Sequence, residues 1–212
     1  MTALHLPRIH LIGPPEGMDA EVFVATVAAA CQGNDVAAHL RMAGRDAAMQ
    51  LAIARKLRAA ASIRTLIIND RVDIALLVHA DGVQLGERGL DVVSARQLLG
   101  PDALIGRSIH AIDGAREAEA AGADYLIAGH VFSTSSKPGE PERGVGWLAQ
   151  VVSAVTVPVI AIGGITARNA HAVMEAGAYG IAVMSAVLWA AEPQKTTAEI
   201  QRIVESCIGG EQ

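Results

Sequence analysis

A hydrophobic segment that ends in Gly129 and His130 is the clearest candidate for chemistry in this chain. Residues 125–128 read Tyr-Leu-Ile-Ala, which is typical of a buried strand, and a long polar loop follows at 131–144. A histidine at the carboxyl end of a strand exchanges protons near neutral pH, and Lys137 in the loop has the charge to meet an anionic substrate. The alternatives are a structural histidine that bonds to a loop carbonyl and a lysine that is only solvated.

Two further segments are suited to binding a phosphate group. Gly163 and Gly164 follow an apolar run at 157–162, and Met184 and Ser185 end another that begins at residue 181. Glycines let backbone amides approach a ligand closely, and unpaired N–H groups at the start of the next segment attract anions. Tight packing would also explain two adjacent glycines, but their place late in a series of strands favours phosphate binding.

Other apolar runs also end in polar side chains. These are Arg41, Asn69, Asp70, Gln84 and Ser108. The Arg41 guanidinium is able to clamp a carboxylate or a phosphate, or else to form a structural salt bridge. Asp70 is equally suited to contacting a ligand and to capping the helix that follows it.

The elements that must position these residues alternate regularly along the chain. Strands are predicted at 9–13, 36–40, 65–68, 82–85, 104–108, 125–128, 157–162 and 181–184, with helical patterns at 19–31, 45–61, 71–79, 91–99, 113–121, 144–154, 167–176 and 196–207. This order predicts a (β/α)8 TIM barrel, with a doubly wound open sheet as the competing architecture. Similar small-residue turns before the strands at 82, 125 and 181 favour the barrel. We expect a single domain over residues 1–212, with a flexible tail at 209–212.

The composition agrees with an α/β protein and excludes several functions. Hydrophobic residues make up 51% of the chain and aromatic residues only 3%, as expected for parallel strands covered by helices. The net charge of −5 argues against nucleic-acid binding, and no apolar run approaches the length that spans a membrane. Cys31 and Cys207 are expected to be reduced thiols in a cytoplasmic protein.

From about Leu66 to Ala190 the chain resembles the superfamily that contains thiamine phosphate synthase and thiazole tautomerase (the TenI family). The motifs that carry the resemblance are Ile-Ile-Asn-Asp-Arg-Val-Asp at 67–73, Gly-Val-Gln-Leu-Gly at 82–86, Ile-Gly-Arg-Ser-Ile-His at 105–110, Gly-His-Val-Phe-Ser-Thr-Ser-Ser-Lys at 129–137, Val-Ile-Ala-Ile-Gly-Gly-Ile-Thr at 159–166 and Ala-Val-Met-Ser at 182–185. The resemblance implies a (β/α)8 barrel that acts in thiamine biosynthesis.

Three positions favour the tautomerase branch. The synthase uses magnesium held by an aspartate like Asp70 and by a second acid, and this chain has Gly89 where that second acid belongs. The synthase also has a histidine where this chain has Gln84, and usually a proline where it has His130. The resemblance therefore implies an isomerase that aromatises a carboxythiazole phosphate, with His130 as the proton-transfer residue and no cofactor or metal.

The resemblance also implies the remaining site residues. The substrate-binding residues expected on this basis are Arg41, Asn69, Gln84, Ser108, Gly129, Thr134, Ser136 and Lys137, and the phosphate-binding residues are Gly163, Gly164, Met184 and Ser185. The expected partners are the thiazole phosphate substrate and, in a homo-oligomer, further copies of the chain.

Two alternatives from other classes stay open. The first is thiamine phosphate synthase, a transferase that joins hydroxymethylpyrimidine diphosphate to thiazole phosphate and uses Mg²⁺ at Asp70. The second is a non-catalytic thiazole phosphate binding protein. It is considered because the family pattern Leu-Arg-Glu-x-Lys is reduced here to Leu40-Arg-Met-Ala-Gly44.

Overall fold

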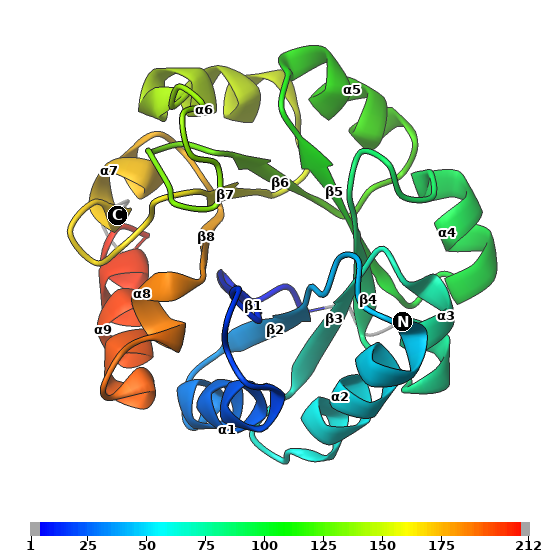
Figure 1. Ribbon diagram of the computed structural model, residues 1–212. Coiled ribbons are helices and arrows are strands. Elements are labelled where there is room, and N and C mark those ends of the chain that lie inside the picture. Colours follow the sequence, from blue (N-terminus) through cyan, green and yellow to red (C-terminus); the bar gives the residue numbers. More distant parts are fainter. Residues whose placement is uncertain (1–4, 209–212) are drawn as a thin grey trace.

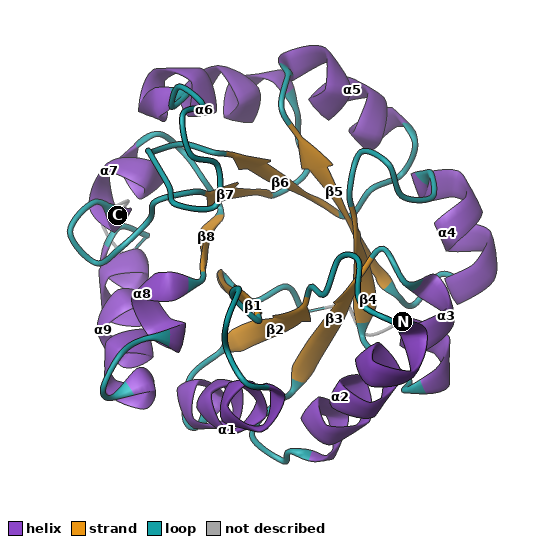
Figure 2. Ribbon diagram, viewed as in Figure 1, coloured by secondary structure: helices purple, strands orange, loops and turns teal. Residues whose placement is uncertain are grey.

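The computed structural model describes residues 5–208, and these form a closed barrel of eight parallel strands surrounded by helices (Figure 1). The strands lie at the centre and the helices form the outer ring, as the colours in Figure 2 show. The strands are β1 (Ile9–Gly13), β2 (Val36–Leu40), β3 (Thr65–Asn69), β4 (Gly82–Leu85), β5 (Leu104–Ile109), β6 (Tyr125–Gly129), β7 (Val159–Ile162) and β8 (Gly180–Val183). The predicted (β/α)8 barrel is confirmed. The tail expected at 209–212 lies outside the described residues.

The helices follow the strands in the predicted order. They are α1 (Ala20–Cys31), α2 (Ala47–Ala59), α3 (Val72–Leu77), α4 (Val92–Leu99), α5 (Ile112–Ala120), α6 (Gly144–Ala154), α7 (Ala170–Glu175), α8 (Ser185–Leu188) and α9 (Pro193–Ser206). Aspartates begin three of them: Asp19, Asp46 and Asp91 each accept backbone N–H bonds from the first turn of α1, α2 and α4. No helix within residues 5–208 has the length and apolar character needed to cross a membrane.

Two elements near the carboxyl end of the chain differ from the expectation. Strand β7 begins at Val159 instead of residue 157, because Pro158 has no N–H to donate to the neighbouring strand. Helix α8 was not predicted, and it starts directly after Met184, whose ψ of −86° leaves the extended conformation. Met184 therefore connects β8 to α8 instead of ending the strand.

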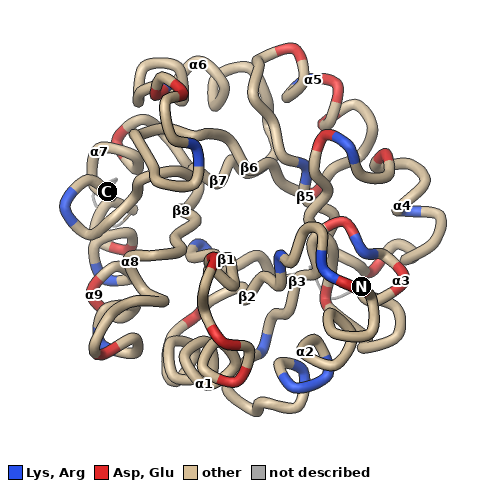
Figure 3. Tube along the Cα trace, viewed as in Figure 1, with Lys and Arg blue, Asp and Glu red and all other residues tan. Residues whose placement is uncertain are grey.

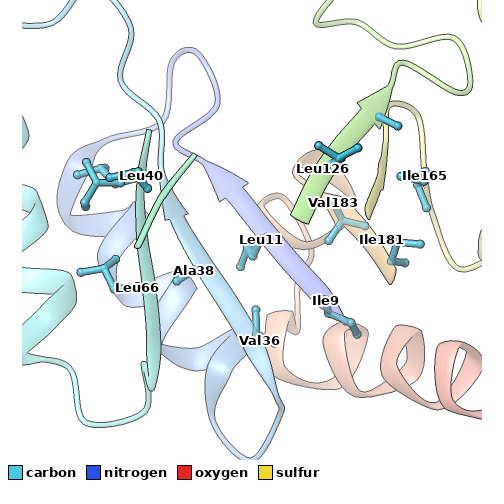
Figure 4. Close-up of a cluster of buried hydrophobic side chains, with 14 of the residues drawn as sticks. Ile9, Leu11, Val36, Ala38, Leu40, Leu66, Leu126, Ile165, Ile181 and Val183 are labelled. Carbon is cyan, nitrogen blue, oxygen red and sulfur yellow. The ribbon is translucent and has the colours of Figure 1, made fainter. Parts of the chain in front are cut away.

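Side chains alternate between two buried layers along each strand. On β1, Ile9 and Leu11 face the helices and pack with residues such as Ala38 and Val183 (Figure 4). The positions between them face the barrel interior, where Ile12 belongs to a second apolar cluster. The barrel closes through the parallel pairing of β1 with β8, with Ile9 opposite Ile181. A strand buried on both faces explains why the sequence shows continuous apolar runs instead of alternation.

The repeated turns before β4 and β6 have the same structural purpose. Asp81 Oδ2 accepts a hydrogen bond of 2.7 Å from the N–H of Leu66 and one of 2.6 Å from Arg58. Asp124 Oδ2 does the same with the N–H of Ile105 and with Arg96, both at 2.6 Å. Each aspartate thus ties the start of one strand to the preceding strand and to a helix. The similarity between these turns in the sequence therefore reflects a repeated strand connection.

Candidate functional site

The polar residues predicted from strand ends lie together at the carboxyl rim of the barrel. Arg41 follows β2, Asn69 ends β3, Gln84 lies in β4 and Ser108 in β5, while His130 follows β6. Because all eight strands are parallel and pair in sequence order, their carboxyl ends form one rim. Figure 3 shows charged residues of both signs spread around the helices and loops, with the barrel wall mostly uncharged.

His130 is held under the loop that follows it. The side chain is only 5% exposed, and its Nε2 lies 3.4 Å from the backbone oxygen of Glu140. Its Nδ1 is buried and has no hydrogen-bond partner among the described residues. The loop is tied down by Glu142, whose carboxylate accepts the Ser133 N–H at 2.9 Å. The predicted histidine is therefore buried at the rim, and its only bond to a loop carbonyl is long.

The two adjacent glycines have a packing role against this histidine. Gly163 has a φ of 103°, and a Cβ there would lie 2.3 Å from the Cβ of His130. Gly164 has a φ of 64°, and its Cβ would lie 2.4 Å from the backbone oxygen of Ser133. Close packing, the alternative considered for these glycines, therefore explains their presence. Ile162 on β7 pairs with Ala182 on β8, so the glycines adjoin the segment that holds Met184 and Ser185. Their phosphate-binding role stays a prediction.

Asp70 stabilises the turn after β4. It has a left-handed backbone with a φ of 58°, and its Oδ1 accepts the Gly86 N–H at 2.7 Å. It does not cap α3, whose N-cap position is Arg71 and has no side-chain capping bond. A Cβ at Gly89 would lie 2.5 Å from Asp70 Oδ1, so a side chain there would require the Asp70 carboxylate to move.

The residues around Asp70 do not form a two-carboxylate metal site. Asp91, an acid at the end of this loop, caps α4 through its bonds to Ser94. Glu87 is exposed, and no group of three or more His, Cys, Asp or Glu side chains within residues 5–208 is arranged to hold a metal ion. Asp70 is thus the one carboxylate that the turn places at this position.

The two predicted cationic side chains, Arg41 and Lys137, differ in whether they contact a carboxylate. Arg41 is exposed, its backbone N–H donates to Gly13 O at 2.6 Å, and no carboxylate in the described part of the chain lies within ion-pair distance of its guanidinium. The structural salt bridge considered for Arg41 is therefore not formed. Lys137 lies 3.4 Å from Glu140, and Thr134 accepts the Ser136 N–H at 3.3 Å within the same loop. These loop residues contact one another, and their role in substrate binding stays a prediction.

A buried polar cluster lies below the rim, and it joins three predicted residues to two histidines that were not predicted. Gln84 donates to Ser108 Oγ at 3.0 Å, and it pairs in register with Asn69 on the neighbouring strand. His10 and His39 lie further inside the barrel and are linked by a bond of 2.8 Å. Neither histidine was among the residues predicted for the site. Each histidine lies between two apolar residues that face the helices, and this alternation is the sequence signal that places both histidines inside the barrel.

Comparisons with known proteins show which family the chain resembles over its length. A family model described as thiamine monophosphate synthase (TMP-TENI) matches residues 10–187. Thiamine-phosphate synthase of Anaeromyxobacter dehalogenans is 44% identical over 185 residues, covering 86% of this chain and 83% of the relative. That of Pyrococcus abyssi is 44% identical over 142 residues, covering 67% of this chain and 68% of the relative.

Solved structures agree with this comparison. Thiamine phosphate pyrophosphorylase from Pyrococcus furiosus matches with a TM-score of 0.83 and 36% identity, covering 95% of this chain and 97% of that one. A 3-hexulose-6-phosphate synthase structure matches with a TM-score of 0.75 but only 16% identity, which shows the shared barrel fold alone.

The expectation of a tautomerase was wrong. The relatives at 37–46% identity are named as thiamine-phosphate synthases, not as thiazole tautomerases. The three residues that favoured the tautomerase have local packing explanations, since Gly89 adjoins Asp70, Gln84 binds Ser108, and His130 packs on Gly163. The chain therefore belongs to the thiamine monophosphate synthase (TMP-TENI) family.

Proposed function

We propose that this protein is a transferase that joins a pyrimidine diphosphate to a thiazole phosphate and forms thiamine phosphate. The observation that carries the proposal is the match to the Pyrococcus furiosus enzyme over 95% of the chain at 36% identity. The 37–46% identity to relatives named thiamine-phosphate synthase supports the same activity.

The reaction requires stabilisation of a leaving anion more than proton transfer. The thiazole ring nitrogen donates its electron pair to the methylene carbon of the pyrimidine, and the carbon–oxygen bond to the diphosphate breaks. Diphosphate leaves with the electrons of that bond, and the attacking nitrogen carries no proton to be removed. The site must therefore align the two rings and hold the diphosphate, whose charge grows as the bond breaks.

Arg41 is the best placed cation for the diphosphate. Its guanidinium is exposed at the rim and forms no ion pair with the described residues, so no internal bond has to break before it binds an anion. A guanidinium forms paired, charge-assisted bonds to phosphate oxygens. Lys137 provides a second positive charge from the loop after β6 once its contact with Glu140 opens.

The other predicted residues are assigned to the two substrates. We place the thiazole phosphate at Gly163, Gly164, Met184 and Ser185, and the rings against the remaining binding residues, which are Asn69, Gln84, Ser108, Gly129, Thr134 and Ser136. His130 Nδ1 has no hydrogen-bond partner among the described residues, and we assign His130 to contact with a bound substrate.

Magnesium is the cofactor implied by the named relatives, but this chain's residues do not fit the two-carboxylate site of the synthase. Asp70 already accepts the Gly86 N–H, and Gly89 has no side chain to contribute. We therefore assign no step of the reaction to a metal ion. Both cysteines are free, and we place the protein in the cytoplasm, where thiols stay reduced.

A two-substrate assay tests the proposal. Purified protein is incubated with hydroxymethylpyrimidine diphosphate and thiazole phosphate, with Mg²⁺ and with a chelator, and thiamine phosphate and diphosphate are quantified by chromatography. We expect thiamine phosphate and diphosphate to form in equal amounts. Absence of product under both conditions would refute the transferase.

A matched pair of variants tests the role of Arg41. Arg41→Gln should raise the KM for the pyrimidine diphosphate by about tenfold or more, because charge-assisted bonds contribute about 1.5–3 kcal/mol. Arg55→Gln removes the same charge from an exposed position on α2 that forms no bond with the described residues, and it should leave the KM unchanged. Equal kinetics of the two variants would show that Arg41 does not bind the diphosphate.

A further inference from the structure

The barrel interior contains a chain of polar groups that begins at its amino end. His10 Nε2 lies 3.0 Å from the backbone oxygen of Pro7, and His10 Nδ1 lies 2.8 Å from His39 Nε2. The two rings are 0% and 1% exposed. The Tyr125 ring lies against His10, with ring centroids 5.3 Å apart. No hydrogen bond or ion pair joins either histidine to a carboxylate in the described part of the chain.

The Pro7 carbonyl fixes where the protons lie on both rings. A carbonyl oxygen only accepts, so His10 must carry its proton on Nε2. The Nδ1 of a neutral His10 is then bare, and His39 must donate to it from Nε2. This leaves the Nδ1 of His39 without a proton, as an acceptor that requires a donor.

The group beside this acceptor is the side-chain amide of Asn69, which lies two residues along β3 from Ile67, the partner of His39 in the sheet. His39 Nδ1 and Asn69 Oδ1 are both buried, and neither has a correctly oriented hydrogen-bond partner among the described residues. Two acceptors facing one another would be unfavourable, whereas turning the amide over satisfies His39 with an N–H from Asn69. The oxygen and nitrogen of such an amide exchange places by a half-turn, with little change in shape.

We propose that His10 and His39 form a neutral hydrogen-bonded pair that positions the side-chain amide of Asn69, with its NH₂ group toward His39 and its carbonyl oxygen toward the rim. His10 and His39 are positioning residues, and Asn69 is the group that meets the ligand. On the proposed transferase, on which this part of the inference rests, the Asn69 oxygen accepts a hydrogen bond from a substrate N–H group.

The environment of the pair keeps both rings neutral. Burial lowers the pKa of His10 to about 4. Burial and the adjacent His10 together lower the pKa of His39 well below its ordinary value, although the Asn69 side chain opposes this shift. A doubly protonated His39 would instead hold the Asn69 oxygen inward. The orientation of the amide therefore follows from the tautomers of the pair.

Nuclear magnetic resonance tests the geometry without any substrate. In protein labelled with ¹⁵N, two-bond ¹H–¹⁵N spectra at pH 7 distinguish a protonated ring nitrogen from a bare one. We expect protonated Nε2 and bare Nδ1 for both His10 and His39, and a nuclear Overhauser contact between the Asn69 NH₂ group and the His39 ring. A protonated Nδ1 on His39 would overturn the proposal.

Two variants of His10 test whether it positions the Asn69 amide through His39. His10→Leu removes the acceptor for His39, so His39 should move its proton to Nδ1 and Asn69 should turn its oxygen inward. The KM for the pyrimidine diphosphate, the substrate with an amino group, should then rise by about fivefold to tenfold, the value of one net hydrogen bond, with kcat changed less. His10→Gln presents an amide N–H to Pro7 and an oxygen to His39, and it should restore the wild-type tautomer and KM.

The outcomes separate the positioning role from the proposed reaction. A changed tautomer with an unchanged KM in His10→Leu would overturn the positioning role, as would equal losses in His10→Leu and His10→Gln. If His10→Leu does not fold, the wild-type spectra and His10→Gln still decide the matter. A wild-type protein with the expected tautomers but without transferase activity would contradict the proposed function alone.

Discussion

Replacing Gly163 by alanine should destabilise the barrel more than any ordinary glycine substitution. The φ of 103° at Gly163 is unfavourable for a residue with a Cβ, at about 1–3 kcal/mol. The new methyl group would also lie 2.3 Å from the Cβ and 2.7 Å from the Cα of His130, and overpacking of this kind typically costs about 1–3 kcal/mol. The free energy of unfolding should therefore fall by about 2–6 kcal/mol.

The loss is large compared with the stability of a typical domain, which is about 5–15 kcal/mol. For a chain of 212 residues it corresponds to a decrease in Tm of roughly 5–20 °C. Urea denaturation followed by the fluorescence of Trp147 and Trp189 measures it directly. Because the contact is with the backbone of His130 as well as its side chain, the variant should also displace His130 at the rim.

Two control substitutions separate backbone strain from steric overlap. Gly122 has a φ of 88° but no atom within 4 Å of an added Cβ, so Gly122→Ala should lose only about 1–2 kcal/mol. Gly146 lies inside α6 with open space around it, and Gly146→Ala should gain about 0.5–1 kcal/mol. If Gly163→Ala and Gly122→Ala lose the same free energy of unfolding, the contact with His130 contributes nothing. If Gly163→Ala has the same free energy of unfolding as the wild type, the predicted strain and overlap at Gly163 are both refuted.

Two further predictions concern titratable groups in the interior. The unfolded chain protonates His10 near pH 6.5 but the folded protein only near pH 4, so the free energy of unfolding should fall by up to about 3 kcal/mol as the pH decreases through this range. Urea denaturation at pH 7 and pH 4.5 measures this loss, and a His10→Gln variant with the same pH dependence would contradict it. Burial raises the pKa of the Cys31 thiol to about 12, so Ellman's reagent should modify Cys207 in the folded protein and Cys31 only after unfolding. Rapid modification that persists in Cys207→Ser would show that Cys31 is accessible.

Most of the barrel could be predicted from the sequence because its signals are local. Each strand is a short apolar run, and small-residue turns mark where strands begin. Both ends of β1, β2 and β4 agree with their predicted residues because these runs are bounded on each side by polar residues or by glycine. Helix α8 has only four residues, and its sequence, Ser-Ala-Val-Leu, carries no helical periodicity. Elements of this length are specified by their surroundings and not by their own sequence.

The composition of the rim was predictable, but the contacts within it were not. A parallel barrel brings all carboxyl ends of its strands together, so strand positions are enough to gather Arg41, Gln84 and His130. The bond from Gly86 to Asp70 joins residues 16 apart, and that from His10 to His39 joins residues 29 apart. No local pattern records such pairs. Alternation along β1 and β2 does place both histidines inside, which is a weaker signal than a motif but was present.

The three residues that favoured the tautomerase branch each contact another residue, and comparing such residues one at a time is misleading. Gly89 adjoins Asp70 Oδ1, and a side chain there requires Asp70 to move. Gln84 Oε1 would lie 2.2 Å from a Cβ at Gly106, so the glutamine and that glycine constrain one another. His130 and Gly163 form a third pair of this kind.

In each pair the two residues touch, so a change at one residue constrains the other. Differences at Gln84, Gly89 and His130 therefore count as evidence of altered packing before they count as evidence of altered chemistry. Identity of 44% over 185 residues samples the strands, turns and rim together, and single positions do not dominate it. Similarity over the whole barrel is accordingly the stronger guide to the family.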